Sequence, residues 1–226
     1  MCLTRLIAAM ILLSVPATRS DAAFIVNGSF ESPTVPVGSF TNFSGGSNAI
    51  TGWTVVGVDS AVVNGTFTQS GIVFQAQSGN QWLDLSGVTS NSNTSGVTQT
   101  VATTAGATYQ LSFYVGSATD NNSFYASTVD LSINGGPRAS FTNPVAPTNR
   151  LDWRQFTASF TATGATTNVT FFNGSAPNNF LSGLDNVSIA EASPMSAVPE
   201  PASMVLLGAG GILLSAGGWW RRVKVC

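Results

Sequence analysis

Short runs in which apolar and polar residues alternate recur through the middle of this 226-residue chain. Alternation sends every second side chain to the same face of a strand, whereas a helix repeats its apolar face every three to four residues. The clearest runs are TYQLSFYV (108–115), STVDLSI (127–133), RQFTASFTA (154–162), TNVTFF (167–172) and DNVSI (185–189). Further candidates are GWTVVGV (52–58), GIVFQ (71–75), NQWLDLSG (80–87) and GVTQTV (96–101). The pattern predicts an all-β fold, an antiparallel two-sheet jelly-roll sandwich of about ten strands.

The first 23 residues differ from this body. They carry a basic start at Arg5, an apolar run over Leu6–Val15 and then the small-residue stretch SDAA. This order is typical of a secretory signal peptide, and the apolar run is too short to span a bilayer. We therefore expect residues 1–23 to direct the chain to the Sec translocon, and residues 24–190 to form one domain.

The C-terminal end predicts a membrane helix. The segment 202–220 is nineteen residues long and carries no charge. As a helix it would be about 28 Å long, which is close to the thickness of the hydrocarbon core of a bilayer. The Pro- and Ser-containing segment 191–201 reads as a linker, and residues 221–226 form a basic end that the positive-inside rule places in the cytoplasm. The expected topology puts the domain outside the cytoplasm, tethered by a single helix.

The composition of the domain excludes several functions. Residues 24–190 contain three arginines, seven carboxylates and no lysine, a net charge of −4, and neither Cys nor His. Nucleic acid is excluded as a partner because its binding needs clustered Lys and Arg. Because residues 24–190 include neither Cys nor His, the domain cannot form disulfides, Cys/His zinc sites or Ser-His-Asp triads. No motif pairs two carboxylates as a glycosidase requires, so we expect no catalytic residues.

Three stretches of the domain carry a resemblance to a known family. They are FIVNGSFESP near the start, NQWLDLSG in the middle and FLSGLDNVSIAEA at the end. Their order and spacing resemble the choice-of-anchor C type of galactose-binding-like sandwich, which is related to plant cell-wall proteins of a domain family without an assigned function. The resemblance implies a β-sandwich that binds polysaccharide rather than cutting it.

The tail resembles the PEP-CTERM sorting signal. The resemblance rests on Pro199, Glu200 and Pro201, the apolar helix, and the pair Arg221 and Arg222. It implies recognition by an exosortase, cleavage near the motif and a Gram-negative bacterium that makes extracellular polysaccharide. Proline stops a helix, so the motif itself should be extended and accessible to a protease.

The resemblance to carbohydrate-binding modules also implies a structural calcium ion. The positions that match its ligands are Glu31, in the opening motif, and Asp185, near the closing strand. Carboxylate oxygens suit Ca²⁺, but calcium needs six to eight oxygens and only two carboxylates are evident. The alternative is that Glu31 and Asp185 accept backbone N–H groups at strand ends.

Aromatic residues are the candidates for glycan contact, because sugar rings stack their apolar faces on aromatic side chains. Alternation places some of them opposite the core face, and one lies in an Asn-rich loop. The candidates are Trp82, Tyr114, Tyr125 and Phe172. The alternative is that these side chains pack beneath a long loop. Trp53 and Trp153 are expected in the core.

Together these features predict an exported, exosortase-processed protein of the cell surface or extracellular matrix that binds polysaccharide and is not an enzyme. It would first be tethered to the inner membrane. Two alternatives stay open: a structural or adhesion protein of the matrix without a sugar site and, more remotely, a glycoside hydrolase.

Overall fold

The computed structural model describes residues 24–89, 91–118, 126–144, 150–177, 179 and 181–192. The expected signal peptide, sorting motif, membrane helix and basic end lie outside these residues, as does Tyr125. Within the described part, no helix is long and apolar enough to cross a membrane.

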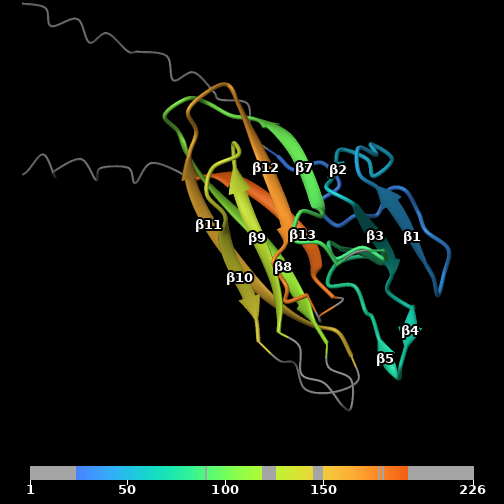
Figure 1. Ribbon diagram of the computed structural model, residues 1–226. Coiled ribbons are helices and arrows are strands. Elements are labelled where there is room, and N and C mark those ends of the chain that lie inside the picture. Colours follow the sequence, from blue (N-terminus) through green and yellow to red (C-terminus); the bar gives the residue numbers. More distant parts are fainter. Residues whose placement is uncertain are drawn as a thin grey trace, which may run out of the picture. The chain divides into compact units, whose positions relative to one another are not determined.

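Two antiparallel sheets form the domain, as the alternation predicts (Figure 1). The six-stranded sheet has, in spatial order, β1 (Phe40–Ser44), β3 (Asp59–Asn64), β6 (Gln81–Asp84), β13 (Gly183–Glu191), β8 (Thr108–Ser117) and β11 (Asp152–Thr161). The five-stranded sheet has β10 (Ala139–Asn143), β9 (Ser127–Ile133), β12 (Thr166–Asn173), β7 (Gly96–Ala102) and β2 (Thr54–Val56). The described residues contain strands and turns but no helix, which confirms an all-β sandwich.

The core lies between the two sheets and follows the predicted alternation. In β8, the inward residues Tyr109, Leu111, Phe113 and Val115 are all fully buried. From the facing sheet, Val169 and Phe171 of β12 meet them, and the rings of Phe113 and Phe171 pack edge to face with centroids 5.0 Å apart. Trp53, expected in the core, is buried there as well. Burial of these large side chains supplies the main driving force for folding.

A short hairpin adds a third layer. It consists of β4 (Thr68–Gln69) and β5 (Ile72–Val73), shown in teal in Figure 1. Ser70 and Gly71, between the strands, both have positive φ angles, 52° and 77°, as a tight hairpin turn of the primed type requires. The hairpin and its flanks pack on the outer face of the six-stranded sheet, where a second apolar cluster forms around Trp82.

The last strand occupies the middle of the six-stranded sheet. β13 pairs with β6 on one side and with β8 on the other, so strands far apart in sequence meet through it. Its register with β8 shifts between Asp185 and Ser188. The fold thus brings the end of the domain next to β6, which contains Trp82 and Asp84.

Candidate functional site

A pocket of about 250 Å³ opens between the hairpin and the outer face of the six-stranded sheet. Its walls come from β1, β3 and β6, from the hairpin, and from two loops. The lining residues are Phe40, Ala61, Val63, Phe67, Gln69, Phe74, Trp82, Asp84, Gly87, Val88 and Leu181. We call this hollow the hairpin pocket.

Four aromatic rings follow one another along its wall. The ring of Phe40 meets that of Phe67 edge to face at 5.4 Å, Phe67 lies 5.6 Å from Phe74, and Phe74 stacks on Trp82 at 6.1 Å. Trp82 Nε1 donates a hydrogen bond of 2.9 Å to the carbonyl of Phe74 and so fixes the hairpin to the sheet. Phe40, with 38% of its surface exposed, forms the rim together with Val88. Such rings present flat apolar faces to anything that enters the pocket.

A carboxylate lies among these rings. Asp84 on β6 is buried, and its Oδ1 accepts hydrogen bonds from the backbone N–H groups of Ser86 and Ser182 and from the Ser86 hydroxyl. Among the described residues, no donor is bonded to its Oδ2. Burial raises the pKa of Asp84 to about 6, against the lowering effect of these hydrogen bonds, and the nearby charge of Asp59 raises it slightly further. The pocket therefore holds an acidic group with one oxygen available.

A second carboxylate, Asp59, lies behind the wall at Gly87. Its Oδ2 accepts hydrogen bonds from the backbone N–H groups of Val88 and Thr89, from the Thr89 hydroxyl and from Asn42 Nδ2. Burial raises the pKa of Asp59, but these hydrogen bonds outweigh it and lower the pKa below its usual value. Its Oδ1 is buried and accepts no hydrogen bond from the described residues. Gly87 has a φ of +65°, and a Cβ there would lie 2.3 Å from Oδ1, so glycine permits this close approach.

Of the four aromatic residues predicted to contact glycan, the structure places Trp82 in the pocket. It points away from Leu83, as alternation predicts, but it is only 1% exposed because the hairpin covers it. Tyr114 is half-buried on the same outer face, opposite Gln155, and does not line the pocket. Trp153, on that face too, is half-buried and packs edge to face against Trp82 at 5.9 Å. Trp153 thus belongs to the second apolar cluster rather than to the core between the sheets.

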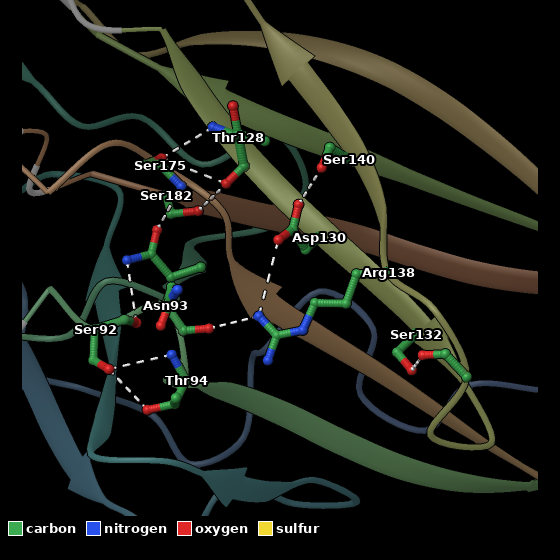
Figure 2. A network of polar contacts seen from close by, with 12 residues as sticks. Ser92, Asn93, Thr94, Thr128, Asp130, Ser132, Arg138, Ser140, Ser175 and Ser182 are labelled. Carbon is green, nitrogen blue, oxygen red and sulfur yellow. Dashed lines mark hydrogen bonds and ion pairs between the residues drawn. The ribbon is translucent and has the colours of Figure 1, made fainter.

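Phe172 lies on the outer face of the other sheet. The guanidinium carbon of Arg138 lies 3.6 Å from the centroid of its ring, so one face of Phe172 is already covered. Figure 2 shows how Arg138 is held: its Nη1 donates to the carbonyl of Asn93 at 2.7 Å and lies 3.9 Å from Asp130 Oδ2. The structure therefore does not bring Phe172 and Trp82 into one site.

Glu31 and Asp185, the predicted calcium ligands, lie near each other and hold one loop. Asp185 Oδ2 accepts from the backbone N–H groups of Gln77 and Ser78, and its Oδ1 accepts from Asn186. Glu31 Oε1 accepts from the backbone N–H groups at positions 80 and 81. Burial raises the pKa of Asp185 to about 7, and the hydrogen bonds that Asp185 accepts from Gln77, Ser78 and Asn186 offset part of this rise.

This geometry fits N–H donors rather than a cation. Three of the four carboxylate oxygens of Glu31 and Asp185 face amide hydrogens, which repel a metal ion. Among the described residues, no three Asp, Glu, His or Cys side chains gather in a metal-binding group. The arrangement corresponds to the alternative considered above, in which Glu31 and Asp185 accept backbone N–H groups, and it leaves the calcium prediction from the sequence untested.

A larger hollow of about 520 Å³ borders Glu31 and the loop that it holds. Its lining comes mostly from Thr, Asn, Gln and Gly residues, with Val35 and Val37, and includes no aromatic ring. Without a flat apolar surface it offers little to stack on. The hairpin pocket is therefore the better candidate for a binding site.

Phe40, Phe67, Phe74 and Asp84 are the site residues that sequence reasoning missed. Phe67 and Phe74 flank the hairpin, whose Ser70-Gly71 turn is a recognisable signal. The short strand Thr68–Gln69 carries no alternating apolar pattern, so its pairing with Ile72–Val73 escaped prediction. Asp84 alternates with Leu83 and Leu85 and therefore reads as a solvent-facing residue.

Solved structures resemble this domain at low identity. A family 35 carbohydrate binding module from Clostridium thermocellum matches at 16% identity with a TM-score of 0.41, over 68% of this chain and 98% of the module. Another family 35 module, from an environmental isolate, matches at 15% identity with a TM-score of 0.40, over 70% of this chain and 89% of the module. A GH26-CBM35 β-(1,4)-mannanase from Podospora anserina matches at 8% identity with a TM-score of 0.42. That match covers 71% of this chain but only 29% of the mannanase.

No curated protein matches the chain. Two protein-family models do match it. Residues 197–222 match the PEP-CTERM protein-sorting motif, which confirms that the tail carries this sorting signal. Residues 23–190 match the model described as protein of unknown function (DUF642). Because that match spans most of the sequence, the chain belongs to the DUF642 family.

Proposed function

We propose that this protein is exported and processed by an exosortase, and that its sandwich binds polysaccharide in the hairpin pocket without cutting it. The sorting motif at residues 197–222 indicates export and exosortase processing. In the proposed route the Sec translocon exports the chain, and the precursor is tethered to the inner membrane. The processed domain then reaches the cell surface or extracellular matrix.

The observation that supports glycan binding best is the combination of aromatic rings and a carboxylate in one pocket. The rings of Phe40, Phe67 and Phe74 offer apolar faces on which a sugar ring can stack. Asp84 Oδ2 is an acceptor for sugar hydroxyls, and Gln69 adds an amide. Ligand sites commonly combine an apolar lining with a few polar groups in this way.

Binding without cleavage is supported by the placement of the two carboxylates. A glycosidase needs one carboxylate on each side of the scissile bond, about 5–10 Å apart. Asp84 lines the pocket, whereas Asp59 lies behind Gly87 and its Oδ2 is already occupied by donors. This arrangement favours a binding site over the hydrolase alternative.

The test is binding of the full chain to an array of glycans, including the exopolysaccharide of its own host. We expect Phe40→Ala, at the exposed rim, to weaken binding roughly three- to tenfold through lost stacking. Phe172→Ala, the same change outside the pocket, should leave binding unaltered. If no glycan binds, the structural or adhesion alternative is favoured, and release of soluble sugar would favour the hydrolase.

Processing is tested at the sorting motif. We expect Glu200→Ala to block cleavage and to leave the protein in the membrane fraction, as judged by its size and distribution on immunoblots. A substitution of both Arg221 and Arg222 should have the same effect, since both belong to the signal. Unaltered release of the Glu200→Ala protein would contradict exosortase processing.

A further inference from the structure

We propose that the hairpin pocket selects a sugar residue that carries a free amino group, so that the preferred glycan contains unacetylated hexosamine. This inference rests on the function proposed above and narrows its ligand. It follows from the charge, the aromatic lining and the size of the pocket.

The charge of the pocket is negative and uncompensated. Asp84 contributes a carboxylate whose Oδ2 has no donor among the described residues, and none of the described lining residues is basic. The domain contains no lysine. Of its arginines, Arg138 lies over Phe172 on the other sheet, and Arg154 lies over Phe156. Arg150 pairs through its backbone with Val73 of the hairpin but does not line the pocket.

A second negative group strengthens this field. Asp59 lies directly behind Gly87 in the pocket wall, and its buried Oδ1 accepts no hydrogen bond from the described residues. The depressed pKa of Asp59 keeps it ionised at neutral pH, and Asp84, with a pKa of about 6, is also mostly ionised at pH 7. Two carboxylates in a partly desolvated wall attract a cation and repel a uronic acid.

The aromatic lining favours the same kind of ligand. An ammonium group close to an aromatic face is attracted by the ring quadrupole, most strongly by tryptophan. The rings of Phe67, Phe74 and Trp82 line the same pocket as Asp84. A protonated hexosamine can therefore place its amino group at Asp84 Oδ2 and its apolar ring face against the phenylalanines.

The size of the pocket limits how much of the glycan enters. A volume of about 250 Å³ lies just below the roughly 300–1,000 Å³ of pockets for drug-sized ligands. One sugar ring suits such a volume, and an extended chain does not. Recognition should therefore depend on a single residue of the polymer and on the group attached to it.

The experiment compares three trisaccharides that differ in one group: those of glucosamine, N-acetylglucosamine and glucose. Their binding to the full chain is measured by calorimetry at pH 7. We expect the glucosamine trimer to bind roughly tenfold more tightly than the other two, through one charge-assisted contact. Equal affinity of all three would overturn this inference while leaving glycan binding intact. Binding of none would overturn this inference, whereas the proposed function would be overturned only if the glycan array also showed no binding.

Three variants locate the effect. Asp84→Asn keeps an oxygen for the Ser86 and Ser182 donors but removes the charge, so it should abolish the preference for glucosamine. Asp130→Asn, the same change on the other sheet, should leave the preference intact. Val88→Lys places a cation at the rim, at a position that is 52% exposed, and should weaken glucosamine binding more than glucose binding. Retention of the preference in both Asp84→Asn and Val88→Lys would contradict the inference.

A last arm separates an amino sugar from a simple amine. Choline presents a cation of similar charge without a sugar ring. We expect it to bind at least about tenfold more weakly than glucosamine, because it lacks the ring stacking and hydroxyl contacts. Choline binding as tight as that of glucosamine would assign the pocket to an ammonium group alone and would overturn the sugar assignment.

Discussion

The two sheets of this sandwich have outer faces that differ in character. The outer face of the six-stranded sheet carries Trp82 and is covered by the hairpin, which creates a second apolar cluster and the hairpin pocket. Among the described residues, no such hairpin covers the outer face of the five-stranded sheet, which carries hydroxyl groups. Thr54, Thr98, Thr170 and Ser132 stand in one row across four strands, and the hydroxyls of Thr98 and Thr170 are 2.8 Å apart. Alternation alone treats these two faces as equivalent.

The cover changes the chemistry that each face can support. Under the hairpin, Asp84 is desolvated, so its charge acts at low effective dielectric and its pKa is raised. On the open face, Asp130 meets Arg138 and Ser140 near water, where ion pairs contribute little. The covered face is therefore the one on which we propose selective binding, although both faces point away from the core.

The largest difference between the two faces should appear on removal of their aromatic residues. Trp82→Ala empties a site that is 1% exposed and should lower the free energy of unfolding by about 3–5 kcal/mol. Phe172→Ala removes a half-buried ring and should lower the free energy of unfolding by only about 1 kcal/mol. Urea denaturation of both variants measures this. Equal losses would show that the hairpin does not make a second core.

The next largest effect concerns pH. Asp185 has a pKa of about 7 in the folded protein and an ordinary value of 3.8, so the folded state binds its proton more tightly than the unfolded state. The free energy of unfolding should therefore fall as the pH rises from about 4 to about 7, by about 1.4 kcal/mol for each unit by which the two pKa values differ. Asp84 contributes in the same direction up to about pH 6.

Urea denaturation at pH 5 and pH 8 tests this dependence. The wild-type protein should be less stable at pH 8, and Asp185→Asn should reduce the difference because asparagine does not titrate. Asp130→Asn, on the open face, serves as the control and should behave like the wild type. A stability that rises between pH 5 and pH 8 would contradict the raised pKa.

A smaller effect is expected on the open face. Arg138→Met removes the cation over Phe172 and the contact to Asp130 while keeping an unbranched chain over the ring. The free energy of unfolding should fall by about 1 kcal/mol, and high salt should diminish the part of this loss that comes from the ion pair. Thermal denaturation at low and at high salt measures the total loss and the part of it that depends on the ion pair. A loss above about 3 kcal/mol would mean that this face is as tightly built as the covered one.

The smallest effect is expected from calcium. Because amide hydrogens already face the carboxylate oxygens of Glu31 and Asp185, the melting temperature should not change when EDTA or excess calcium is added. Thermal denaturation of the full chain under both conditions checks this. A rise of several degrees in the melting temperature with calcium would support a calcium site at Glu31 and Asp185. Such a site would require the loop at 77–81 to rearrange.

The sequence predicted the sandwich well because alternation is a local property. The buried set of β8, from Tyr109 to Val115, and the opposite placement of Tyr114 could both be read from one strand. The sorting motif of the tail could be read equally well, because Pro-Glu-Pro, an uncharged apolar stretch and two arginines follow one another directly in the sequence.

The pocket could not be read in the same way. It depends on a hairpin whose first strand, Thr68–Gln69, has two polar residues and no periodic pattern. Whether Trp82 and Asp84 meet solvent or a third layer depends on where that hairpin folds back, which is a tertiary property. The direction of a side chain follows from its strand, but its cover follows from a segment elsewhere in the chain.

The central position of β13 bears on export itself. A chain that crosses a membrane from its N-terminus delivers β1 to β12 before β13 arrives, so β6 and β8 lack their common neighbour until the end of the domain has emerged. The six-stranded sheet cannot close earlier, and Trp82 and Asp84 remain without their final surroundings. Because the last strand lies at its centre, the six-stranded sheet can be completed only after residues 183–191 have followed the rest of the domain across the membrane.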